Sequence, residues 1–211
     1  MTFFAFCGIP ALITIFLLPR IKAIALNFGF TDHPSPRKQH KKPLVRFGGV
    51  AMAISFYITI IALLIVFKSN LIDYEGIEII WVLVGTSLCF FLIGLTDDIF
   101  QLSPWPRLGF QVAIACFAWS NGLSINTINI PWANGINDSI TFSTPISILI
   151  TTFWIVGVTN AINWLDGLDG LAAGIVGISA LEISIISASN NNVGASIASI
   201  VLAGCCIGLL R

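Results

Sequence analysis

Seven long apolar runs, separated by short polar segments, constrain this chain more than any other feature. Six of them contain no charged residue, and the seventh, 171–187, is interrupted only by Glu182. The charge-free runs are residues 1–18, 47–67, 79–96, 108–123, 142–159 and 193–210. Because about 20 mostly apolar residues span a bilayer as a helix, the pattern predicts an all-α polytopic membrane protein with about seven transmembrane helices. We expect residues 1–211 to form a single transmembrane domain.

Composition excludes several other classes of protein. Charged residues make up 9% of the chain and apolar residues 56%, whereas about 25% of the residues in a soluble domain are charged. Ten basic and ten acidic residues give a net charge of zero, so the chain lacks the net positive charge that is typical of a nucleic-acid-binding protein. Disordered chains are poor in apolar residues. We therefore expect a lipid bilayer, and no nucleic acid, as a partner.

The basic residues predict the orientation of the chain. Seven of the ten Lys and Arg residues lie in segment 20–46, and cytoplasmic loops of membrane proteins carry an excess of both types. Alternation then places 97–107 and 160–170 in the cytoplasm as well, with the N-terminus outside. Polar and apolar residues alternate in external segment 121–141, on either side of a turn at 131–137. This alternation predicts a small β-hairpin near 124–142.

The first cytoplasmic segment carries a basic cluster, stiffened by prolines that each fix a backbone φ angle. Its candidate substrate-binding residues are Arg37, Lys38, His40 and Arg46. Guanidinium and ammonium groups suit phosphate oxygens. The alternative is an ordinary basic loop that contacts anionic lipid headgroups.

The second cluster is the pair Asp97 and Asp98 at the cytoplasmic end of the third apolar run. Adjacent carboxylates repel each other unless a cation lies between them, and hard oxygen ligands favour Mg²⁺. The alternative is a solvated acidic helix end, although acids at a helix C-terminus oppose the helix dipole.

In the third cluster polar residues recur at every third position, as Asn160, Asn163, Asp166 and Asp169. Two Asp-Gly pairs predict that the helix unwinds here, and non-helical backbone near membrane depth requires a protein or aqueous environment. The alternative is a polar turn between helices. Taken together, the three clusters predict a phosphoryl-transfer centre with Mg²⁺ at the inner leaflet.

These motifs resemble those of the polyprenyl-phosphate N-acetylhexosamine-1-phosphate transferases, glycosyltransferase family 4, which include the phospho-N-acetylmuramoyl-pentapeptide translocase. Family members carry D-x-P-x-x-R-K-x-H-x-x-P leading to R-x-G-G, here 32–49. They carry a DD motif followed by a segment similar to L-S-P, here 97–104. They also carry the motif N-x-x-N-x-x-D-G-x-D-G-L-A, here 160–172. The three motifs occur in the family's order, and the resemblance covers essentially the whole chain.

The resemblance implies an enzyme of the plasma membrane with its active site on the cytoplasmic face. A UDP-N-acetylhexosamine, such as UDP-N-acetylglucosamine, would give its sugar-1-phosphate to polyprenyl (undecaprenyl) phosphate, releasing UMP. The polyprenyl diphosphate-sugar would start the synthesis of a cell-envelope polysaccharide, such as peptidoglycan or lipopolysaccharide.

The resemblance also implies roles for residues. Asp97 or Asp98 would deprotonate or position the lipid phosphate, and both would lie with Asn163 at Mg²⁺. Asp166 and Asp169 would orient nucleotide or metal ligands. Asn160 and the basic cluster would bind substrate. Assembly into a homodimer is left open.

The chain departs from the family in length. Family members usually have about ten or eleven spans, and residues 1–211 contain neither the later G-D-x-G-S motif nor the His-rich cytoplasmic loop. We expect the chain to be the N-terminal part of such an enzyme, inactive by itself.

Two further interpretations remain open at this stage. An intramembrane prenyltransferase also uses Asp-rich loops and Mg²⁺, but its carboxylates favour D-x-x-x-D spacing and the basic cluster would go unexplained. In a transporter or channel, Glu182 would be an intramembrane proton or ion site. The paired acids at 97–98 and the acids of 160–170 lie in segments predicted to share the cytoplasmic surface, instead of along a pathway through the membrane.

The predicted orientation is testable by cysteine labelling. In a variant without the native cysteines, Ser35→Cys, Ser103→Cys and Leu168→Cys should resist an impermeant thiol reagent in intact cells and react after the cells are opened. Labelling of any of them in intact cells would contradict the shared cytoplasmic face.

Overall fold

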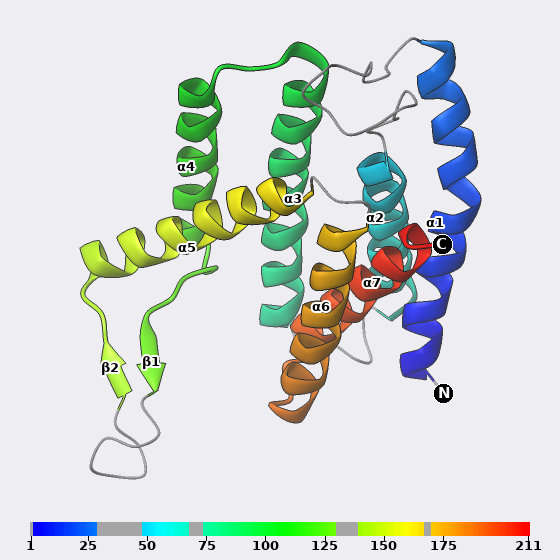
Figure 1. The fold of residues 1–211 in the computed structure, drawn as a ribbon. Helices are drawn as coiled ribbons and strands as arrows, with labels where there is room; N and C mark the ends of the chain where they lie inside the picture. The colour runs from blue at the N-terminus through cyan, green and yellow to red at the C-terminus, as the bar shows by residue number, and fades with distance from the viewer. Residues whose placement is uncertain (1, 29–47, 68–73, 130–138, 167–169) are drawn as a thin grey trace. The chain divides into compact units, whose positions relative to one another are not determined.

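The computed structural model describes residues 2–28, 48–67, 74–129, 139–166 and 170–211, which form seven helices and one two-stranded sheet (Figure 1). The helices are α1 (Thr2–Asn27), α2 (Gly48–Phe67), α3 (Tyr74–Phe100), α4 (Pro104–Ser120), α5 (Thr144–Leu165), α6 (Leu171–Ser189) and α7 (Val193–Leu209). The antiparallel strands are β1 (Thr127–Asn129) and β2 (Ser139–Thr141), with Ile128 opposite Ile140. One helix lies at each predicted run, and the hairpin lies where the alternation predicted it.

The length and composition of the helices confirm the all-α polytopic class. Among the described residues, five helices are long and apolar enough to cross a membrane: α1, α2, α3, α5 and α6. Helices α4 and α7 have 17 residues each. Large apolar side chains such as Leu12, Phe153 and Trp164 are exposed on their surfaces, as expected where lipid instead of water surrounds the helices.

The chain divides into two compact units. The first comprises Met1–Ile80 and Leu165–Arg211, and the second comprises Trp81–Trp164. The first therefore contains α1, α2, α6 and α7, and the second contains most of α3, together with α4, the hairpin and α5. A single transmembrane domain over residues 1–211 stays a prediction.

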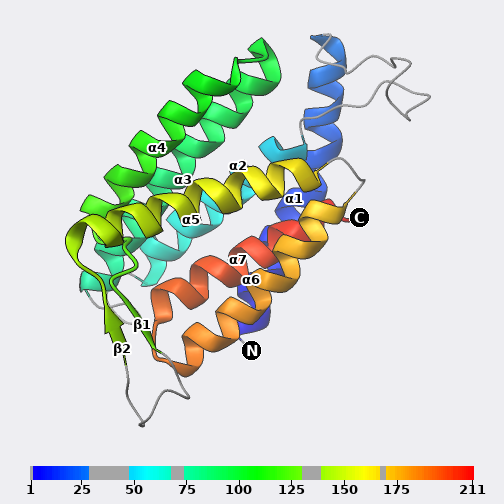
Figure 2. The same ribbon diagram turned by 60° about the vertical axis from the view of Figure 1, so that its left-hand side comes forward.

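Helix α7 packs against α1, α2 and α6 and forms the core of the first unit. Figure 2 shows α6 and α7 side by side. Small residues allow close approach: a Cβ atom on Gly204 would overlap the carbonyl oxygen of Cys7 in α1. Ser184 and Ser196 each donate a hydrogen bond to the other's carbonyl oxygen, at 2.9 and 3.0 Å. Close backbones and hydrogen bonds between helices hold membrane helices together when the surroundings are as apolar as the side chains.

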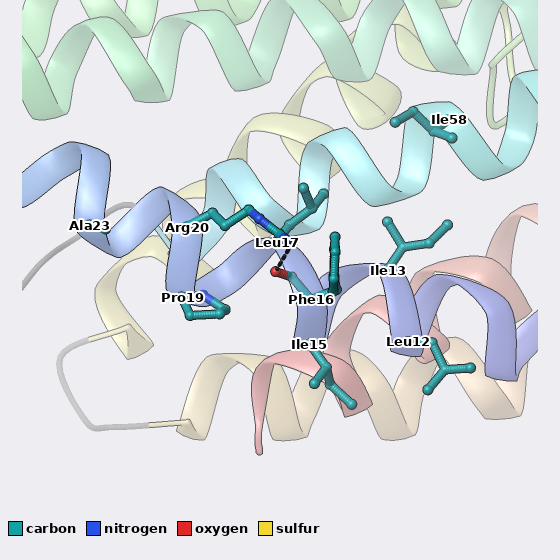
Figure 3. A pocket seen from close by; sticks show the side chains of 9 residues that line it. All are labelled: Leu12, Ile13, Ile15, Phe16, Leu17, Pro19, Arg20, Ala23 and Ile58. Carbon is teal, nitrogen blue, oxygen red and sulfur yellow. Dashed lines mark hydrogen bonds between the residues drawn. The ribbon is translucent and has the colours of Figure 1, made fainter.

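An apolar groove of about 970 Å³ runs along α1 in the same unit (Figure 3). Arg20, a cation among the described residues that line the groove, curls back on its own helix. The guanidinium carbon lies 3.4 Å from the centre of the Phe16 ring, and Nη1 donates to the Phe16 carbonyl oxygen at 3.2 Å. The aliphatic part of the Arg20 side chain therefore covers apolar surface, while its charged group lies at the end of the apolar run.

The packing of α7 on α1 predicts an asymmetry between two glycines. Gly204→Ala should lower the free energy of unfolding by about 1–3 kcal/mol, because the new methyl group meets backbone that cannot move aside. Gly174→Ala in α6 is the matched control: nothing lies within 4 Å of its new Cβ atom, and alanine favours a helix by about 1 kcal/mol over glycine. Thermal unfolding in detergent measures both. Equal midpoints for the two variants would contradict the packing.

Candidate functional site

The turn between α3 and α4 brings the paired acids to the start of the next helix. Gln101 has a φ of +50° and donates its N–H to the carbonyl oxygen of Asp97 at 2.8 Å, which closes α3. Ser103 is extended and Pro104 opens α4, where the missing N–H of proline costs no hydrogen bond. The end of α3 and the first turn of α4 therefore lie at the same end of the second unit.

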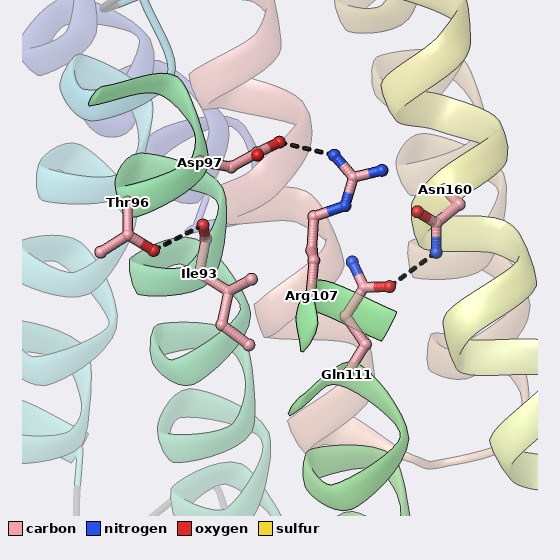
Figure 4. A network of polar contacts seen from close by, with 6 residues as sticks. All are labelled: Ile93, Thr96, Asp97, Arg107, Gln111 and Asn160. Atoms are coloured by element: carbon pink, nitrogen blue, oxygen red, sulfur yellow. Dashed lines mark hydrogen bonds and ion pairs between the residues drawn. The ribbon is translucent and has the colours of Figure 1, made fainter. Parts of the chain in front are cut away.

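Arg107, in the first turn of α4, forms an ion pair with Asp97 (Figure 4). Its Nη1 lies 2.5 Å from Oδ2 of Asp97, and the two side chains are 22% and 23% exposed. Asp98 is exposed at the end of α3. Arg107 thus supplies a positive charge beside Asp97, so the protein itself balances part of the negative charge at the end of α3.

One turn further along α4, Gln111 is only 6% exposed and fixes the Asn160 side chain of α5. Nδ2 of Asn160 donates to Oε1 of Gln111 at 2.7 Å and to the carbonyl oxygen of Val156 at 2.8 Å. Because both amide hydrogens are engaged, the carboxamide is held in one orientation, and its oxygen remains the group that can accept from a ligand.

A groove of about 980 Å³ lies between α4 and α5. Arg107 and Asn160 line one end of it, and Pro145 lies toward the hairpin. At 1.5 Å per residue, the stretch from Pro145 to Asn160 is about 22 Å long. The walls are otherwise mostly apolar: Pro104, Leu108, Val112, Ile148, Leu149, Thr152, Phe153, Val156, Gly157, Ala161 and Trp164.

Hydrogen bonds also connect α4 and α5 at the hairpin end of the groove. The indole N–H of Trp119 donates to Oγ of Ser147 at 2.8 Å, and Ser147 donates to Oδ1 of Asn126 at 2.7 Å. The N–H of Ile125 donates to Oγ1 of Thr151 at 2.9 Å. Together with the pair Asn160 and Gln111, these contacts fix the groove at both ends.

Two exposed tryptophans mark the polar end of the groove. Trp105 at the start of α4 is 81% exposed, and Trp164 at the end of α5 is 80% exposed. Tryptophan is enriched where a membrane meets water. The ion pair and the amide pair therefore lie at the depth expected for a membrane–water boundary.

The structure places the predicted site residues in three groups. Asp97, Asp98, Asn160 and Asn163 belong to the second unit, whereas Asp166, exposed in the turn after α5, belongs to the first. Asn163 is exposed on α5. The remaining predicted residues lie outside the described part of the chain: Arg37, Lys38, His40, Arg46 and Asp169.

The predicted unwinding across 160–170 is wrong for its first half. Helix α5 continues to Leu165, and the described chain leaves the helix only at Asp166. The reason is local, because Asn160 donates to its own helix at Val156 and across to Gln111, so the amide needs no break in the helix.

The donors at the end of α3 fit a divalent cation in type. Carboxylate and carboxamide oxygens are the ligands that Mg²⁺ prefers, and Asp97 and Asp98 are adjacent there. Within the described residues, no three His, Cys, Asp or Glu side chains come together as a metal site. A complete Mg²⁺ site thus stays a prediction.

Arg107 and Gln111 are functional candidates that the sequence analysis missed. Their spacing of four places them on one face of α4, and a glutamine inside an apolar run is costly without a partner. That cost indicates from the sequence that Gln111 has a hydrogen-bond partner, but it does not indicate which helix supplies the partner.

The amide pair predicts a measurable coupling between α4 and α5. Gln111→Leu and Asn160→Leu should each destabilise the protein, and the double variant should lose less than their sum, with a coupling of about 1 kcal/mol. Thermal unfolding of the four proteins in detergent gives this coupling. Strictly additive losses would show that the two amides do not interact.

Comparison with known proteins shows where the chain belongs. The sequence profile described as glycosyl transferase family 4 matches residues 80–211. A probable undecaprenyl-phosphate N-acetylglucosaminyl 1-phosphate transferase of Bacillus subtilis is 32% identical over 203 residues, which are 96% of this chain and 53% of the relative.

Other relatives have related names. A decaprenyl-phosphate N-acetylglucosaminephosphotransferase of Mycolicibacterium smegmatis is 30% identical, over 95% of this chain and 50% of its own length. A phospho-N-acetylmuramoyl-pentapeptide-transferase of Staphylococcus carnosus is 32% identical, over 84% of this chain and 57% of its own length. The chain spans about half the length of the curated relatives it matches. The family resemblance of the three motifs is confirmed: the chain belongs to glycosyl transferase family 4.

Proposed function

We propose that this chain takes part in transferring an N-acetylhexosamine-1-phosphate from a UDP-sugar to a polyprenyl phosphate at the cytoplasmic face of the plasma membrane. The products are a polyprenyl diphosphate-sugar and UMP. The names of the relatives support a polyprenyl phosphate acceptor and an amino-sugar phosphate group. The basic segment 20–46 supports the cytoplasmic orientation.

The observation that carries the proposal is the groove between α4 and α5. It is apolar along most of its length and has Arg107 and Asn160 at one end. A polyprenyl phosphate has the same division, with a long hydrocarbon chain and one anionic end. In this proposal the hydrocarbon lies along the groove, and the phosphate lies beside Arg107, whose guanidinium hydrogen-bonds phosphate oxygens well.

The chemistry is a displacement at phosphorus. An oxygen of the lipid phosphate attacks the phosphorus that carries the sugar, and the bond from this phosphorus to the oxygen retained by UMP breaks. Asp97 or Asp98 takes the proton of a protonated lipid phosphate or positions its attacking oxygen. The ion pair with Arg107 holds Asp97 in place for this role.

The remaining predicted residues hold the nucleotide and the metal. Oxygens of Asp97, Asp98 and Asn163 would hold Mg²⁺, which would supply charge neutralisation at the diphosphate. The carboxamide oxygen of Asn160 accepts a hydrogen bond from substrate. Asp166 and Asp169 orient nucleotide or metal ligands, and the basic cluster binds phosphate through Arg37, Lys38, His40 and Arg46.

A transfer assay tests the acidic residues. In a full-length relative that carries the same motifs, the changes corresponding to Asp97→Asn, Asp98→Asn and Asp166→Asn should each lower kcat by about 10²–10³, the usual value of a lost electrostatic contact in the transition state. The assay follows labelled lipid-linked sugar and UMP from UDP-N-acetylglucosamine, undecaprenyl phosphate and Mg²⁺.

The change corresponding to Ser103→Ala is the matched control, because Ser103 precedes α4 without a side-chain cap hydrogen bond. It should retain activity. Near-normal turnover in all three acidic variants, with membrane levels unchanged, would mean that the acidic clusters are structural.

A further inference from the structure

Asn160 presents a hydrogen-bond acceptor to the polar end of the groove between α4 and α5. The side-chain amide of asparagine carries two hydrogens and one carbonyl-type oxygen. One hydrogen is donated to Oε1 of Gln111 at 2.7 Å and the other to the carbonyl oxygen of Val156 at 2.8 Å. Asn160 lines the groove, so a molecule that reaches this end meets Oδ1 and not an amide hydrogen.

Gln111 holds this orientation from a position behind Asn160. It is 6% exposed and is not among the described residues that line the groove. Figure 4 shows its Oε1 facing Nδ2 of Asn160. A reversed Asn160 amide would lose both hydrogen bonds and bring its oxygen against two acceptors, and buried polar groups without partners are costly. Gln111 therefore helps to fix which atom of Asn160 faces the groove.

A cation beside this acceptor restricts the chemistry of the ligand. Arg107 lines the same end of the groove and attracts an anion. The oxygens of a fully ionised anion are acceptors only, so they repel Oδ1 of Asn160. An anion that also carries an O–H group satisfies both residues. A phosphate monoester that retains one proton is such an anion, whereas a sulfate monoester has the same shape and one charge but no proton.

We propose that Gln111 is a positioning residue through which the groove selects a phosphate ester over a sulfate ester. Arg107 binds an ionised oxygen of the phosphate, and Oδ1 of Asn160, held by Gln111, accepts a hydrogen bond from the P–OH group. This inference rests on the proposed function, in which the lipid phosphate lies at this end of the groove. It adds that the lipid phosphate binds in the form that still carries a proton.

Competition between two matched lipids tests this selection. The full chain in bilayer discs binds labelled farnesyl phosphate, and unlabelled farnesyl phosphate, farnesyl sulfate and farnesol compete for the site. The assay is run at about pH 5.5, below the second pKa of about 6 of a phosphate monoester. Farnesyl phosphate should compete about 10–100-fold better than the sulfate, the value of one hydrogen bond to a charged group. Farnesol measures the contribution of the hydrocarbon alone.

Substitutions of Gln111 test its positioning role. Gln111→Met keeps the length of the side chain but removes the acceptor, which leaves one amide hydrogen of Asn160 without its partner. If the amide turns that hydrogen into the groove, a sulfate oxygen accepts it, so the preference for phosphate should fall to about 3-fold or less, mainly through tighter sulfate binding. Gln111→Glu should retain the preference, because a carboxyl oxygen also accepts from Asn160 and an added charge affects both anions alike.

Ser147→Ala is the matched control for a loss of stability. It removes the contacts of Ser147 with Trp119 and Asn126 at the hairpin end of the same two helices. The unfolding midpoint should fall, as in Gln111→Met, but the ratio of phosphate to sulfate binding should stay that of the parent. A role of Gln111 in stability alone would give the same ratio in both variants.

The proposed function and this inference fail in different ways. If farnesyl phosphate competes no better than farnesol in the parent chain, the groove is not a phosphate site and the proposed function loses its main support. If phosphate and sulfate compete equally in the parent, the groove binds anions without the selection that we infer. A parent preference that persists in folded Gln111→Met and Gln111→Leu would show that another acceptor binds the P–OH group, and would overturn the role of Gln111.

Discussion

A bilayer offers no hydrogen bonds to a helix that crosses it, and the rest of this structure depends on that constraint. A polar side chain within an apolar run is costly unless it has a partner in its own backbone or on a neighbouring helix. Ser55 of α2 donates to the carbonyl oxygen of Pro10 in α1 at 2.8 Å. Ser184 and Ser196 exchange hydrogen bonds between α6 and α7. These contacts decide which helices are neighbours, because apolar packing alone gives little preference in lipid.

The same constraint shapes the candidate site. Gln111 and Asn160 satisfy each other across α4 and α5, and at the other end of these helices Trp119 donates to Ser147. The groove between the two helices is therefore bordered by polar pairs and lined by apolar side chains. A long apolar molecule with one phosphate matches this arrangement better than a small polar metabolite does, and this match connects the fold to the proposed lipid acceptor.

The acids at the end of α3 show how tertiary contacts modify a motif. The pair Asp97 and Asp98 is recognisable in the sequence as an oxygen-rich site for a cation. In the structure Arg107 already balances part of that charge. The ion pair fixes the orientation of Asp97, while Asp98 is exposed. Of the two neighbouring carboxylates, Asp97 therefore has a defined ion-pair partner, which the sequence motif alone does not show.

The sequence by itself determined the seven helices and the hairpin. Apolar runs of membrane length and the alternation around 131–137 are local signals, and the backbone must follow them in lipid. It also marked Asp97, Asp98 and Asn160 as site candidates, since polar groups near membrane depth are expensive. Only the tertiary structure decided that Arg107 pairs with Asp97, that Gln111 holds Asn160, and that α5 stays helical to Leu165. These outcomes depend on which helices lie side by side. The sequence does not reveal this, because the apolar character of a run identifies a membrane helix but does not identify its neighbour.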